Sequence, residues 1–324
     1  ALIRHLFYHL KSKYITIYLD ILPSESLGDL LNLLSNAIAS EYSERTSTGK
    51  KIWTMIKSFR PVISYDSLSG QPQISIQASP EESKQAIGEL FSFLESQSSP
   101  VIIAIDEFQQ ILEYPEKNTD AWLRSLVQKL KNVNFIFSGS QQHFMQDLFA
   151  NPERPFFRST QFMKIGKLDK EVYADFIMDL FNKHSKFLSK ETVDEMLKWS
   201  DYHTYYVQLL CNRIFLSSGK KITIETWKNE AARILKEQEF VFFGYREMLT
   251  KLQWELLKAI AIEGKVYQPT SSKFIGNYSL GNPATVRRSL MSLQKMELIY
   301  REVNDEGEYF YSVYDVLFRR WIKG

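Results

Sequence analysis

One stretch of the chain limits its fold more than any other. Residues 101–105 are consecutive apolar residues, mostly β-branched, and they run directly into two adjacent carboxylates, Asp106 and Glu107. An apolar run without alternation is typical of a strand that is buried on both faces of a parallel sheet. Open parallel sheets bind their ligands at the carboxyl ends of the strands. The sequence therefore predicts two acids at a ligand-binding edge.

Adjacent acids in this position fit the hydrolysis of a magnesium nucleotide. The first carboxylate, Asp106, is suited to hold Mg²⁺, usually through water, and Glu107 is suited to polarise an attacking water. A buried strand followed by a solvated acidic turn is the alternative that this stretch alone leaves open.

Composition narrows the class of protein. A chain of 324 residues, 44% hydrophobic and 24% charged, suggests two or three ordinary globular domains. Its net charge of +2 is too small to indicate nucleic acid or an anionic membrane as a partner. A single cysteine, Cys211, excludes an internal disulfide and favours a reducing compartment, so we expect a cytoplasmic protein. No apolar run approaches the roughly 20 residues of a spanning helix, so no membrane segment is expected.

The amino end predicts a helix over residues 1–10 and a strand over 14–20, with no capping residue before the helix. In P-loop NTPases the helix in this place begins with the Lys and Ser/Thr of GxxxxGK[ST], whose backbone amides cradle phosphates. That pattern does not occur in residues 1–324. We expect the phosphate loop and its strand to precede Ala1, since losing a central strand would leave a gap in the parallel ladder. The alternative is a protein without the loop.

The middle of the chain supplies further candidate residues. A helix is predicted over 28–44 and a hairpin insertion within 45–80, followed by a helix that begins at Ser79-Pro80. Beyond the acids, a helix over 119–130 leads to an apolar strand that ends in Ser138-Gly139-Ser140.

A hydroxyl one strand away from the carboxylates is suited to orient the attacking water or to sense the γ-phosphate. Ser140 is our first candidate and Ser138 the second, with a plain helix cap as the alternative. Arg154 and Arg158 lie in a Pro-containing turn, and an arginine that meets the γ-phosphate stabilises the transition state. A surface arginine is the alternative for each.

At this point the order of segments resembles the archaeal-type AAA+ ATPases, which lie near the origin-recognition ATPases and the signal-transducing STAND NTPases. The motifs that carry the resemblance, in chain order, are IIAIDEFQQI, FIFSGS and FFRSTQFMKIGKL. The resemblance implies an α/β fold with a three-layer, parallel-sheet P-loop NTPase core of the AAA+ type, a helical lid and a winged-helix domain. The expected domains are residues 1–166 for the core, without its phosphate loop and first strand, 167–240 for the lid and 241–324 for the winged helix.

The resemblance also implies a role for each matching residue. Asp106 becomes the Mg²⁺ carboxylate and Glu107 the catalytic base. Ser140 becomes the first sensor, where many relatives have Asn or Thr, and Arg158 the arginine finger. In the lid, His203-Thr204 stands where relatives often carry a Gly-x-Pro-Tyr turn against the nucleotide, so both are candidate nucleotide contacts. Core packing of the neighbouring aromatic residues is the alternative.

The carboxyl-terminal segment predicts three helices and a β-hairpin, the element order of a winged helix, whose third helix can enter a DNA groove. Arg287 and Arg288 lie on the predicted exposed face of that helix and are candidate DNA contacts. Residues 241–324 hold 12 Lys/Arg and 9 Asp/Glu, a net of +3, and the hairpin turn is acidic, which weighs against DNA. Docking to a protein is the alternative.

Three functional hypotheses follow. The first is an ATP-binding, Mg²⁺-dependent hydrolase that acts as a nucleotide-dependent switch, with a protein partner or self-association as its output. The second is a winged-helix DNA-binding protein on an ATPase frame. The third is a degenerate ATPase that serves as a scaffold.

Overall fold

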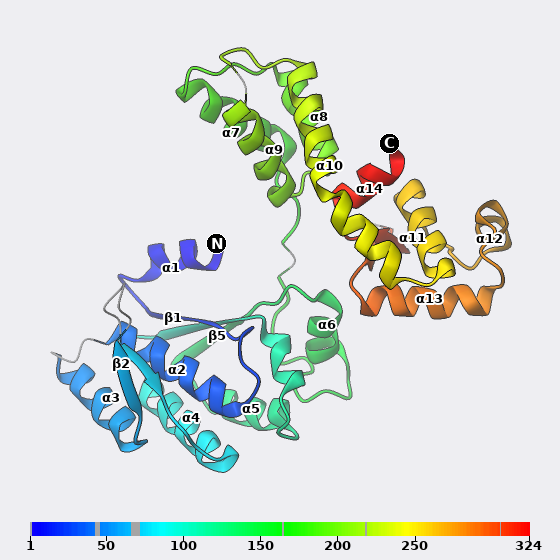
Figure 1. Cartoon of the computed structure of the whole chain (residues 1–324). Coiled ribbons are helices and arrows are strands. Elements are labelled where there is room, and N and C mark those ends of the chain that lie inside the picture. Colours follow the sequence, from blue (N-terminus) through cyan, green and yellow to red (C-terminus); the bar gives the residue numbers. More distant parts are fainter. Residues whose placement is uncertain (1, 43–45, 66–71, 164, 218, 305) are drawn as a thin grey trace. The chain divides into compact units, whose positions relative to one another are not determined.

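The computed structural model describes residues 2–42, 46–65, 72–163, 165–217, 219–304 and 306–324. The chain divides into two compact units, Ala1–Met163 and Lys164–Gly324. Each unit has its own apolar core, and Figure 1 draws the helices and strands that form each unit.

A parallel sheet organises the first unit. Strand β4, Val101–Asp106, lies between β1, Ile15–Asp20, and β5, Val133–Phe137, and both pairings are parallel. The three strands pair directly with one another, in the order β1-β4-β5. A further strand can join the sheet only beside β1 or beside β5.

The apolar run forms β4 as predicted, and its interior position explains the composition. Val101, Ile103 and Ala104 are completely buried in this central strand, which has β1 on one side and β5 on the other. The helices of this unit are α1 Leu2–Leu10, α2 Leu27–Glu41, α3 Ser47–Ser58, α4 Pro80–Glu95, the 3-10 helix η1 Phe108–Glu113, α5 Thr119–Val127 and α6 Gln142–Ala150.

Local signals set the ends of several of these helices. Ser26 caps α2 through the backbone N–H of Asp29, while Ser79 and Glu82 form the capping box of α4. The predicted hairpin insertion consists of β2, Val62–Tyr65, and β3, Pro72–Ser75, which pair antiparallel. Residues 66–71 of that insertion lie outside the described part of the chain.

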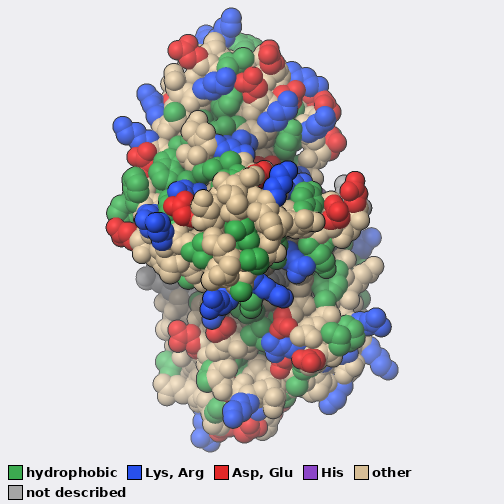
Figure 2. Space-filling model, turned by 90° about the vertical axis from the view of Figure 1, so that its right-hand side faces the viewer, with side chains coloured by type: hydrophobic (Ala, Val, Ile, Leu, Met, Phe, Trp, Pro, Cys, Tyr) green, Lys and Arg blue, Asp and Glu red, His purple; other side chains and the backbone are tan. Residues whose placement is uncertain are grey.

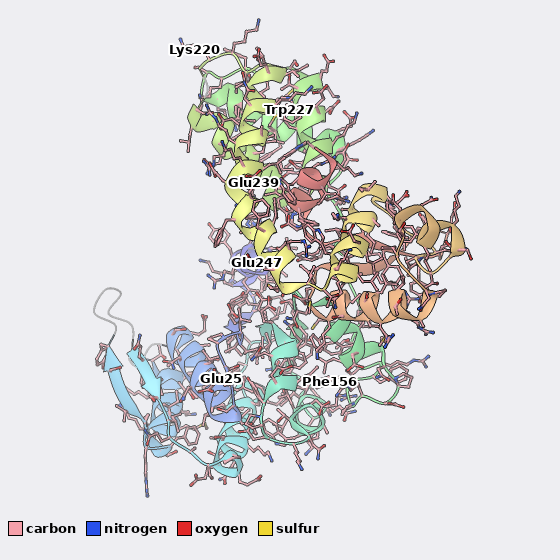
Figure 3. The ribbon with its side chains drawn as sticks, turned by 45° about the vertical axis from the view of Figure 1, so that its right-hand side comes forward. Glu25, Phe156, Lys220, Trp227, Glu239 and Glu247 are labelled. Carbon is pink, nitrogen blue, oxygen red and sulfur yellow. The ribbon has the colours of Figure 1, made fainter. Side chains whose placement is uncertain are left out.

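The second unit is helical with one hairpin. Its elements are α7 Lys170–Lys183, α8 Lys190–Trp199, α9 Thr204–Ser217, α10 Ile224–Met248, α11 Lys251–Glu263, α12 Ser272–Tyr278, α13 Pro283–Lys295, β6 Ile299–Val303, β7 Tyr309–Val313 and α14 Val316–Lys323. Buried side chains from α7 to α14 form one continuous core that includes Trp227, labelled in Figure 3.

The long helix α10 runs through residue 240, the expected boundary between lid and winged helix. Polar contacts join the same two segments, because Arg319 of α14 pairs with Asp201 at 2.9 Å and the Tyr206 hydroxyl donates to Asp315 at 3.2 Å. The lid and winged-helix segments are thus packed together in one unit.

The surface in view in Figure 2 carries interspersed Lys/Arg and Asp/Glu side chains, in keeping with the small net charge. Among the described residues, no helix combines the length and the apolar character needed to cross a membrane.

Candidate functional site

Asp106 lies at the carboxyl end of β4 and is held by donors from both neighbouring strands. The Tyr18 hydroxyl of β1 donates to its Oδ2 at 2.5 Å, and the Ser138 hydroxyl after β5 donates to its Oδ1 at 2.6 Å. The backbone N–H of Glu107 also donates to Oδ1, at 3.3 Å. Burial works against the charged carboxylate, but these donors outweigh it and hold the pKa of Asp106 below its usual value. Asp106 is therefore ionised at neutral pH.

Glu107 adopts a left-handed backbone conformation, with φ of 56°. For a residue with a side chain this costs about 1–3 kcal/mol and commonly marks functional sites. The turn ends β4 and starts η1, and it directs the Glu107 carboxylate toward the end of β5. There Oε2 accepts from the Gln109 side-chain amide at 2.5 Å and from the Ser140 hydroxyl at 2.8 Å.

The two candidate serines contact different acids. Ser140 contacts Glu107 through its hydroxyl and its backbone N–H, the latter at 3.3 Å, whereas Ser138 contacts Asp106. The structure thus brings together all four polar side chains that the sequence placed at the ends of β4 and β5. The catalytic roles expected for them stay predictions.

Sequence reasoning missed three residues of this cluster. Tyr18 belongs to a predicted strand, but its contact with Asp106 depends on the register that sets Asp20 opposite Asp106. Gln109 is buried, and its Oε1 has no hydrogen-bond partner among the described residues. Gly139 leaves room for that amide, since a Cβ there would lie 2.1 Å from Gln109 Oε1. The small residue within Ser-Gly-Ser was the available signal.

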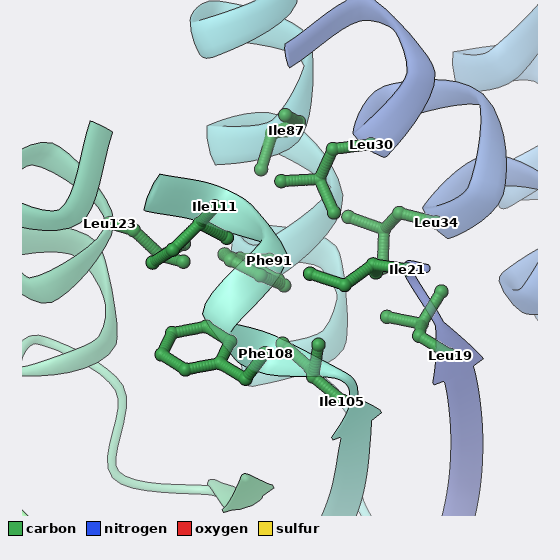
Figure 4. A pocket seen from close by; sticks show the side chains of 10 residues that line it. All are labelled: Leu19, Ile21, Leu30, Leu34, Ile87, Phe91, Ile105, Phe108, Ile111 and Leu123. Carbon is green, nitrogen blue, oxygen red and sulfur yellow. The ribbon is translucent and has the colours of Figure 1, made fainter. Parts of the chain in front are cut away.

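The side chains that line a small cavity beside these acids are all apolar. Figure 4 shows a small cavity lined by side chains from β1, α2, α4, the end of β4, η1 and α5. Its lining residues are Leu19, Ile21, Leu30, Leu34, Ile87, Phe91, Ile105, Phe108, Ile111 and Leu123. The lining has no polar side chain to orient a nucleotide, so this space is part of the core.

The arginines of the turn after α6 differ in their surroundings. Arg154 is engaged by acids, with Asp147 at 2.5 Å and Asp120 at 3.7 Å. Arg158 is exposed, and its guanidinium lies 5.1 Å from the ring centroid of Phe157. Arg158 is the better candidate for a phosphate contact, because Arg154 already has carboxylate partners.

The other candidates lie in the second unit. His203 and Thr204 are exposed at the start of α9, and partial burial together with nearby Lys167 lowers the pKa of His203. Arg287 and Arg288 are exposed on α13.

The donor set fits a metal held jointly with a nucleotide. Across the described residues there is no group of three or more His, Cys, Asp or Glu side chains able to hold a metal ion. Asp106 is an ionised oxygen ligand of the kind that Mg²⁺ prefers, and Mg²⁺ in nucleotide sites commonly takes only one or two carboxylates besides phosphates. The site therefore suits Mg²⁺ bound with a nucleotide better than a resident metal.

Comparison with known proteins supports the fold. Residues 240–324 match a family model described as "Probable winged helix domain". No curated protein matches the chain.

Two solved structures resemble nearly the whole chain. A Walker-type ATPase of Pyrococcus abyssi is 16% identical, with a TM-score of 0.63, and the match covers 98% of this chain and 87% of that one. The ORC2 protein of Aeropyrum pernix, solved in ADPNP–ADP complexes, is 10% identical with a TM-score of 0.55, covering 98% of this chain and 78% of that one. At these identities the likeness concerns the fold. It confirms the predicted α/β fold, with a parallel-sheet core like that of the Walker-type ATPase, followed by a segment that matches a winged-helix model.

Proposed function

We propose that this protein binds and hydrolyses ATP with Mg²⁺ at the ends of β4 and β5, and that the nucleotide state controls its helical and winged-helix segments. The observation that carries the proposal is the pair of oriented carboxylates, Asp106 and Glu107, each bonded to a hydroxyl from the end of β5. The fold shared with a Walker-type ATPase supports it. Arg158, His203 and Thr204 are proposed as further nucleotide contacts.

Asp106 would hold the Mg²⁺ of the nucleotide, and the ion would neutralise charge on the β- and γ-phosphates. Glu107 would accept a proton from the attacking water, and Ser140 holds the Glu107 carboxylate in place at 2.8 Å.

The full-length protein with its native amino terminus is expected to bind ATP more tightly in Mg²⁺ than in EDTA. Asp106→Asn should remove most of the Mg²⁺-dependent gain, because a neutral amide is a poor ligand for a hard cation. Isothermal titration calorimetry under both conditions measures this. Asp20→Asn is the matched control, since Asp20 lies opposite Asp106 on β1 and should leave the gain unchanged. Absence of ATP binding by the unsubstituted protein would reject the proposal.

A second candidate function is DNA binding by the winged helix. The match to the winged-helix model and the exposed pair Arg287 and Arg288 on α13 favour it, because the third helix of this module is the one that enters a groove. Exposed Glu306 and Glu308 beside the hairpin turn oppose it by repelling phosphates.

If this helix contacts DNA, the double variant Arg287→Ala/Arg288→Ala should weaken binding to duplex DNA. Each lost phosphate contact should lower the slope of log affinity against log salt by about 1. Mobility shifts at several salt concentrations measure both quantities. Arg213→Ala is the control, because Arg213 lies on α9 and pairs with Glu237. If the unsubstituted protein gives no mobility shift with duplex DNA at low salt, this second function is excluded.

A further inference from the structure

We infer that Tyr18 is a positioning residue that fixes the Asp106 carboxylate so that one oxygen, Oδ2, faces the nucleotide-bound Mg²⁺; this inference rests on the proposed ATPase function. Tyr18 lies on β1, in a strand adjacent to β4, and was not among the residues that the sequence motifs indicated. The geometry of the donors around Asp106 carries the argument.

The two oxygens of Asp106 are not equivalent. Oδ1 accepts two hydrogen bonds, from the Ser138 hydroxyl at 2.6 Å and from the Glu107 backbone N–H at 3.3 Å. Oδ2 accepts one, from the Tyr18 hydroxyl at 2.5 Å. Each carboxylate oxygen has about two acceptor positions. Oδ1 is therefore saturated, and Oδ2 keeps one position for the metal or a metal-bound water.

The Tyr18 ring is itself held in place. The guanidinium of Arg4 on α1 lies 4.5 Å from the ring centroid, within the range of a cation–π contact. Tyr18 thus connects α1 with the acid at the end of β4. The Asp106 carboxylate accepts hydrogen bonds at both oxygens, from Tyr18 of β1 and from Ser138 after β5. It therefore cannot rotate about χ2 without breaking a hydrogen bond.

Removing one of these donors should weaken the Mg²⁺ dependence of ATP binding while Asp106 itself stays in place. Partners that orient a metal ligand typically contribute about 10–100-fold to metal affinity or activity. Tyr18→Phe deletes only the hydroxyl and is expected to raise the Mg²⁺ concentration that half-saturates ATP binding by about 10-fold. Ser138→Ala, which removes a donor to Oδ1, should shift it in the same direction.

The test is calorimetric titration of the full-length protein with ATP across a series of Mg²⁺ concentrations and in EDTA. The affinity for ATP in EDTA should be the same for Tyr18→Phe and the unsubstituted protein. This comparison separates a loss of metal-ligand positioning from a loss of the folded binding site. Tyr114→Phe is the matched control: it removes a buried phenol hydroxyl that lies 2.5 Å from Ser24 Oγ in the same unit, and its Mg²⁺ dependence should be normal.

The outcomes separate this inference from the function on which it rests. If the unsubstituted protein binds MgATP but Tyr18→Phe has an equal or lower Mg²⁺ requirement, the positioning role is wrong and the ATPase proposal stands. If the unsubstituted protein binds no ATP, both are overturned. A raised Mg²⁺ requirement in Tyr18→Phe and Ser138→Ala, but not in Tyr114→Phe, supports the inference.

Discussion

Replacing Glu107 by glutamine is expected to lower the rate of ATP hydrolysis by about 100-fold to 10,000-fold while ATP binding persists, because a general base contributes a factor of this size. The variant should accumulate bound ATP, since the amide cannot take a proton from the attacking water. Single-turnover hydrolysis and calorimetric affinity, measured on the full-length protein, report the two quantities separately.

The contacts of Glu107 explain why glutamine should keep the local hydrogen bonds. Three donors converge on Oε2: the Gln109 amide at 2.5 Å, the Ser140 hydroxyl at 2.8 Å and the Ser140 backbone N–H at 3.3 Å. A glutamine oxygen can accept the same bonds, so its NH₂ would occupy the position of Oε1. If Glu107 is the base, Oε1 is therefore the oxygen left to accept the proton, and Glu107→Gln replaces that atom by a donor.

Glu113→Gln provides the comparison for this experiment. Glu113 is an exposed carboxylate at the other end of η1, so the same chemical change there should leave hydrolysis intact. Equal turnover by Glu107→Gln and the unsubstituted protein would remove Glu107 from the mechanism. Loss of ATP binding in Glu107→Gln would mean that the residue supports the binding site rather than the chemical step.

The sequence predicted the elements of the core because their signals are local. Unbroken apolar character identified β4, and the Ser79-Pro80-Glu81-Glu82 sequence identified the start of α4. The acids and the two serines were placed together correctly, because the carboxyl ends of adjacent parallel strands meet at one edge of a sheet.

The residues that sequence reasoning missed depend on tertiary register. Whether Tyr18 or another residue of β1 reaches Asp106 is decided by the pairing of Asp20 with Asp106, and no local pattern encodes that alignment. Gln109 is polar in a segment that gave no sign of burial, yet it lies inside and contacts Glu107. The order of the strands in the sheet was likewise not readable from the sequence, because tertiary pairing sets it.

Replacing Phe108 by alanine is expected to cost about 3–5 kcal/mol of unfolding free energy in the first unit, the typical loss for a buried aromatic residue. Phe108 is completely buried directly after the two acids. Its ring centroid lies 4.2 Å from that of Phe137, 5.8 Å from Phe149 and 5.4 Å from Phe156, which is labelled in Figure 3. The substitution would leave an apolar hole beside the cavity of Figure 4, where no polar group can hold water.

Hydrogen exchange measured by mass spectrometry can localise this loss, which a global melt of a two-unit chain cannot, since such chains need not unfold in one step. Peptides covering β4 should lose protection in Phe108→Ala, whereas peptides from α11 to α14 should keep theirs. Phe162→Ala removes a side chain that is 60% exposed in the same unit and should cost much less. Equal protection of β4 in both variants would show that the ring contacts of Phe108 do not stabilise the end of this strand. The placement of Asp106 and Glu107 would then need another cause.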